Sequence, residues 1–188
     1  MSRDYKWEAT KAAWRGVEVV FTAAEYAWGW FFPDPKIIDG AGAIKKLPAQ
    51  IKADGKKKVL IVTDKGLMSL NLLDGLFDAM KKEGVDYVVY DEVQPNPSIE
   101  NVEAALKLYK DNGCEAIVAV GGGSPMDVAK AVGVVAKFGG TIGDYEGVGK
   151  VPGPIDTLIA VPTTAGTGSE VTCLLYTSDA ADDTPCVD

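Results

Sequence analysis

A run of three glycines at 121–123, followed by Ser124, Pro125 and Asp127, contains residue types that can bind a phosphate group. The run lies between the apolar segment 116–120 and a helical pattern, so it predicts a turn that opens a helix. Ser124 suits the N-cap, Pro125 the first helical position, and Asp127 completes a capping box. Glycines let a ligand approach the backbone closely, and the free N–H groups of a helix start favour an anion. The alternative is a tight turn without a ligand, but three consecutive glycines exceed what such a turn needs.

Two further segments have side chains that suit a nucleotide. Small and hydroxyl residues at 162–170 follow the apolar segment 157–162, and ligands of parallel sheets bind at the carboxyl ends of strands. An ordinary loop is the alternative there. Asp64 ends the apolar segment 58–64, where a carboxylate can accept hydrogen bonds from ribose hydroxyls and repel a 2′-phosphate. Capping of a helix that begins at Lys65 explains Asp64 equally well from the sequence.

The elements that position these residues alternate along the chain. Strands are expected at 58–64, 86–93, 116–120 and 157–162. Helical patterns separate them, one ending at Gly84 and one running from Ser98 to Gly113. This alternation predicts an α/β fold, a Rossmann-like parallel sheet with helices on both faces. Three parts are expected: a helical extension over 1–31, a nucleotide-binding domain over 32–172, and a disordered tail over 173–188.

Composition excludes several classes of function. The 188 residues include 27 Asp and Glu against 19 Lys and Arg, a net charge of −8, so nucleic acid and membranes are not expected partners. The three cysteines form no CxxC pair and the N-terminus has no signal-peptide pattern, so a cytoplasmic protein is expected. Histidine, the commonest metal ligand, is absent from the sequence.

The segments GGGSPMDVAK (121–130) and AVPTTAGTGSEVT (160–172) resemble the iron-containing alcohol dehydrogenase family. VLIVTD (59–64) and QPNPS (94–98) support the resemblance, which covers about 32–172. It implies an N-terminal α/β domain that binds NAD or NADP and a C-terminal helical domain that binds Fe²⁺ or Zn²⁺.

The resemblance also implies roles for particular residues. Those expected to hold the pyrophosphate are Gly122, Gly123, Ser124 and Asp127. Those expected to line the cleft on the nicotinamide side are Thr163, Thr164 and Thr167. Asp64 would contact the adenosine ribose, Asn96 would lie near the adenine, and an acidic residue at 64 favours NAD over NADP.

The sequence departs from the family from Cys173 onward, and without histidine the family's metal ligand set cannot be present. We therefore expect neither catalytic nor metal-binding residues in this chain, which by itself would be inactive. The implied full enzyme is a homo-oligomer that transfers hydride between a small primary alcohol or diol and its aldehyde. The alternatives are a glycerol dehydrogenase-like member of the superfamily and a non-catalytic nucleotide-binding module.

Overall fold

The computed structural model describes Lys36, Ile38, Gly40, residues 42–147 and 150–164, and Ser169. The chain divides into two compact units, Met1–Ile37 and Ile38–Asp188, and the described helices and strands all belong to the second. The predicted extension (1–31), Thr167 and the predicted tail (173–188) lie outside the described residues. No helix in the described part is both long and apolar enough to cross a membrane.

A four-stranded sheet forms the centre of the second unit, and its neighbouring strands are all parallel. The strand order is β2-β1-β3-β4, with bounds Lys58–Val62 for β1, Asp86–Tyr90 for β2, Ala116–Gly121 for β3 and Leu158–Pro162 for β4. Leu60 pairs with Val88 on one side and with Ile117 on the other. The four predicted strands are present, although β1 and β2 end earlier than expected, at Val62 and Tyr90.

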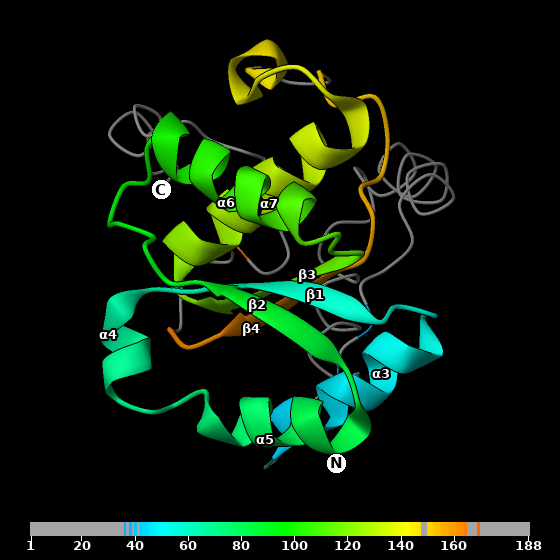
Figure 1. The fold of residues 1–188 in the computed structure, drawn as a ribbon. Helices are drawn as coiled ribbons and strands as arrows, with labels where there is room; N and C mark the ends of the chain where they lie inside the picture. Colours follow the sequence, from blue (N-terminus) through cyan, green and yellow to red (C-terminus); the bar gives the residue numbers. More distant parts are fainter. Residues whose placement is uncertain are drawn as a thin grey trace, which may run out of the picture. The chain divides into compact units, whose positions relative to one another are not determined.

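Helices cover both faces of this sheet (Figure 1). Their bounds are Ala43–Lys46 (η1, a 3₁₀ helix), Leu47–Ala53 (α3), Lys65–Ser69 (α4), Asp74–Glu83 (α5), Ile99–Asp111 (α6), Gly123–Phe138 (α7) and Ile142–Tyr145 (η2, a 3₁₀ helix). Successive side chains of a strand point to opposite faces, so Val59 and Ile61 pack with residues of α3 and α5. Leu60 and Val62 pack with residues of α6 and α7. The predicted Rossmann-like α/β fold is confirmed.

The helix ends follow the predicted stop signals. Gly84 caps α5 with a left-handed backbone (φ 68°), a conformation that glycine adopts without a Cβ penalty. Gly113 (φ 62°) follows α6 in the same way. Ser98 occupies the N-cap position of α6, as expected, but its side chain makes no capping hydrogen bond.

The predicted start of α7 is wrong. Ser124 is not the N-cap: α7 begins at Gly123 with Gly122 as its N-cap, and no side chain caps it. Pro125 is therefore third in the helix, and Asp127 does not close a capping box with Ser124. The reason is the positive φ of Gly121 (151°), which turns the chain sharply enough for helix to start directly after β3.

Candidate functional site

A cleft of about 450 Å³ lies beyond the carboxyl ends of β1, β2 and β3. Its lining comes from the segments that follow these strands: Asp64, Lys65, Gly66, Val93, Gln94, Pro95, Gly122, Gly123, Ser124 and Pro125. The chain leaves β1 toward β2 through α4 and α5 and returns from β2 to β3 through α6, on the opposite face. Connections that leave neighbouring strands on opposite faces open a crevice at the strand ends, where ligands of such sheets bind.

Packing alone explains Gly121 and leaves little room for a side chain at Gly122. A Cβ on Gly121 would lie 2.6 Å from Cγ of Pro125, too close for any real contact. A Cβ on Gly122 would lie 3.1 Å from Oγ1 of Thr164, which follows β4. The sequence argument that three glycines exceed the needs of a turn is therefore weakened, and the case for a ligand rests on the cleft.

The start of α7 gives this cleft its anion-binding character. The first N–H groups of a helix have no partner within the helix, and no side chain caps α7. Gly123 and Ser124 supply such N–H groups, while Pro125 has none to supply. Because these residues line the cleft, the positive end of the α7 dipole lies at its wall.

Asp64 lines the same cleft as this helix start. Its Oδ1 accepts a hydrogen bond from the Leu67 N–H at 3.0 Å, so it is the N-cap of α4. A Cβ at Gly66 would lie 2.8 Å from the same Oδ1, so a side chain there would displace the Asp64 carboxylate. The capping interpretation of Asp64 is confirmed. Contact with a ribose stays a prediction, and the position of Asp64 in the cleft wall is compatible with both.

Asp127 lies farther along α7 and does not line the cleft. Its Oδ1 is 3.4 Å from Nζ of Lys130, whose side chain is only 9% exposed. Burial raises the pKa of Asp127 above its usual value, and the charge and hydrogen bond of Lys130 only partly oppose this. The structure therefore shows Asp127 as the partner of a buried lysine, and its predicted contact with pyrophosphate stays a prediction.

Replacing Asp127 with Asn is expected to change the pH dependence of stability. Because the pKa is higher in the folded state, the folded protein binds this proton more tightly, and stability falls as pH rises from 3.8 through the raised value. An asparagine does not titrate. As the pH rises from about 4 to about 7, the unfolding free energy of Asp127→Asn should therefore increase relative to that of the wild type. Urea unfolding at both pH values measures this, and a parallel pH dependence for both proteins would contradict it.

The remaining predicted residues are placed differently. The Thr163 N–H donates to the Gly121 carbonyl at 2.9 Å, and Thr164 packs against Gly122, so both lie beside the glycine turn. Asn96 is exposed, has a left-handed backbone (φ 54°) and does not line the cleft. Its place near the adenine stays a prediction, and its neighbours Gln94 and Pro95 line the cleft.

Sequence reasoning missed Lys65 and Gln94 as lining residues. Both follow the carboxyl end of a strand, Lys65 after β1 and Gln94 after β2. The rule that ligands bind at these ends would have identified them had it been applied to every strand.

The described residues do not suit a metal ion. No three His, Cys, Asp or Glu side chains gather in residues 42–147 or 150–164 to hold one. The family's metal therefore does not fit this part of the chain, which contains no histidine.

Comparisons with known proteins agree on one family. The model for iron-containing alcohol dehydrogenase matches residues 34–185, beyond the boundary at Thr172 that the resemblance predicts. The NAD-dependent methanol dehydrogenase of Bacillus methanolicus is 41% identical over 151 residues, covering 80% of this chain and 40% of that enzyme. A 1,3-propanediol oxidoreductase crystal structure superposes with a TM-score of 0.69 at 35% identity, covering 77% of this chain and 41% of that one.

A second solved structure is sulfoacetaldehyde reductase from Bifidobacterium kashiwanohense in complex with NAD⁺, with a TM-score of 0.67 at 37% identity. It covers 73% of this chain and 36% of that one. The chain thus spans about two fifths of the length of such relatives. Because the family model matches most of the sequence, the chain belongs to the iron-containing alcohol dehydrogenase family.

Proposed function

We propose that this domain binds NAD in the cleft beyond β1, β2 and β3, as the nucleotide-binding part of a NAD-dependent, metal-activated alcohol dehydrogenase. The observation that carries the proposal is that one cleft joins Asp64 to the uncapped start of α7. Helix starts of this kind bind phosphate, and a carboxylate at the end of a neighbouring strand binds ribose hydroxyls. The NAD⁺ complex of the sulfoacetaldehyde reductase supports the same cofactor here.

Each part of the cleft has a defined task in this proposal. The N–H groups of Gly123 and Ser124 bind the pyrophosphate, and Gly122, which has no side chain, leaves the turn open beside Thr164. Asp64 binds the adenosine ribose and disfavours a 2′-phosphate, which makes NAD the cofactor rather than NADP. When bound, NAD supplies the group that accepts or donates a hydride.

The reaction of the whole protein is hydride transfer between a small primary alcohol or diol and its aldehyde, and the whole protein is a homo-oligomer. Methanol and 1,3-propanediol dehydrogenases among the relatives support this substrate class. The metal, Fe²⁺ or Zn²⁺, would be held by residues other than those the structure describes, because no suitable group of side chains is found among these.

Ser124→Glu tests the cofactor site. A glutamate in the first turn of α7 suits the helix dipole and preserves folding, but it puts bulk and negative charge where the pyrophosphate would bind. We expect the dissociation constant for NADH, followed by its fluorescence, to rise about tenfold or more, a loss of at least about 1.4 kcal/mol.

Ile99→Glu is the matched control. It adds the same charge to the first turn of α6, at a side chain that is 53% exposed and outside the cleft lining. NADH affinity should then change far less than in Ser124→Glu. Equal losses of NADH affinity in the two variants, or no NADH binding by the wild type, would contradict the proposed site.

A non-catalytic nucleotide-binding module is the second candidate, favoured by the lack of a metal-ligand group among the described residues. It predicts NADH binding by the chain without alcohol oxidation in the presence of Fe²⁺. Iron-dependent oxidation of a small alcohol by the purified chain would exclude it.

A further inference from the structure

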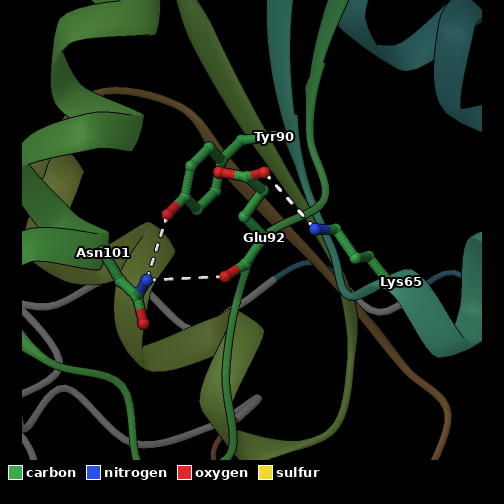
Figure 2. A network of polar contacts seen from close by, with 4 residues as sticks. All are labelled: Lys65, Tyr90, Glu92 and Asn101. Atoms are coloured by element: carbon green, nitrogen blue, oxygen red, sulfur yellow. Dashed lines mark hydrogen bonds and ion pairs between the residues drawn. The ribbon is translucent and has the colours of Figure 1, made fainter.

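One wall of the cleft contains a lysine that already forms an ion pair. Lys65 lines the cleft next to Asp64, and its Nζ lies 3.4 Å from Oε1 of Glu92 (Figure 2). Both side chains are largely exposed, 72% for Lys65 and 64% for Glu92, so this ion pair lies in contact with solvent. Glu92 itself lies outside the cleft lining.

The backbone of Glu92 is held from two directions. It forms an isolated antiparallel bridge with Asp64, which ties the segment after β2 to the segment after β1. Nδ2 of the buried Asn101 lies 3.4 Å from the Glu92 carbonyl and 3.2 Å from the hydroxyl of Tyr90 (Figure 2). The Glu92 backbone is thus held at two points beside the carboxylate that pairs with Lys65.

This arrangement has a consequence for cofactor choice. NADP differs from NAD by a phosphate on the adenosine ribose, the part of the cofactor assigned to Asp64. A free lysine next to Asp64 would attract that phosphate and offset the repulsion by the Asp64 carboxylate. A lysine paired with Glu92 offers less net positive charge to that phosphate.

We propose that Glu92 is a specificity-determining residue that acts through Lys65: by pairing with it, Glu92 keeps the lysine from binding a 2′-phosphate and so sustains the preference for NAD. The inference rests on the proposed NAD site and extends it to a residue outside the cleft lining. Glu92 is a positioning residue in this scheme, since it need not touch the cofactor.

The test is the ratio of the dissociation constants of NADPH and NADH, measured by fluorescence titration of the 188-residue chain. In Glu92→Gln this ratio should fall about threefold, the size expected for an exposed charge pair. The shift should shrink as salt is added, because exposed charges are screened. A change in the ratio that came from lost side-chain packing in Glu92→Gln would not depend on salt in this way.

Lys65→Met supplies the control. If Glu92 acts through Lys65, the double variant should show the same ratio as Lys65→Met alone. The inference is overturned if Glu92→Gln changes both affinities equally, or if its effect persists in the Lys65→Met background. Failure of the wild type to bind either cofactor would instead refute the NAD site itself.

Discussion

Gly121→Ala is expected to destabilise the domain by about 3 kcal/mol. The backbone at Gly121 has φ 151°, which an alanine adopts only with strain of about 1–3 kcal/mol. The new Cβ would also lie 2.6 Å from Cγ of Pro125, whose ring is held in the first turn of α7 and cannot move away cheaply. Overpacking of this kind costs about 1–3 kcal/mol more. Urea unfolding followed by circular dichroism measures the loss.

Gly84→Ala separates these two causes. Gly84 also has a positive φ of 68°, but a Cβ there would meet nothing within 4 Å. That variant should lose only about 1–2 kcal/mol, the cost of a left-handed backbone. If Gly121→Ala is no more destabilising than Gly84→Ala, the contact with Pro125 does not fix the turn. The domain would then tolerate a side chain at the start of the proposed phosphate site.

Asp64→Ser is expected to change the ratio of NADPH to NADH affinity by about a hundredfold in favour of NADPH. A hydrogen bond to a charged group contributes about 1.5–3 kcal/mol, so loss of the ribose contact should weaken NADH binding about tenfold. Removing the carboxylate should strengthen NADPH binding by a similar factor, because its repulsion of the 2′-phosphate disappears. Titrations with the two reduced cofactors give both numbers.

Serine is the informative replacement because Asp64 also caps α4 through the Leu67 N–H. Serine is a good N-cap and preserves the helix start, whereas Asp64→Ala should lower the unfolding free energy by about 1 kcal/mol. Comparing the two variants separates the effect on the helix from the effect on the cofactor. An unchanged affinity ratio in Asp64→Ser, with stability preserved, would show that Asp64 serves only as a cap.

The sequence by itself determined the fold class. Alternation of apolar runs such as 58–62 with helical patterns such as 99–111 reflects local geometry, since strand and helix periods are properties of consecutive residues. The ends of α5 and α6 at glycines were predictable for the same reason. The two motifs at 121–130 and 160–172 also indicated the family that the comparisons show.

The start of α7 was not predictable, although it is local. Ser124 looked like a better N-cap than Gly122, but the turn at Gly121 and its contact with Pro125 place the first helical residue at Gly123. The preference for serine over glycine at an N-cap is a small energy, and the steric fit between β3 and α7 outweighs it.

The tertiary structure alone decided which residues share the cleft. Asp64, Gln94 and Gly123 are far apart in the sequence and meet only because β1 lies between β2 and β3. The pairing of Lys65 with Glu92 results from the same packing, whereas Asp127 and Lys130 lie three residues apart on α7 and pair locally. Strand order and side-chain partners depend on contacts between distant segments, and local periodicity carries no information about these.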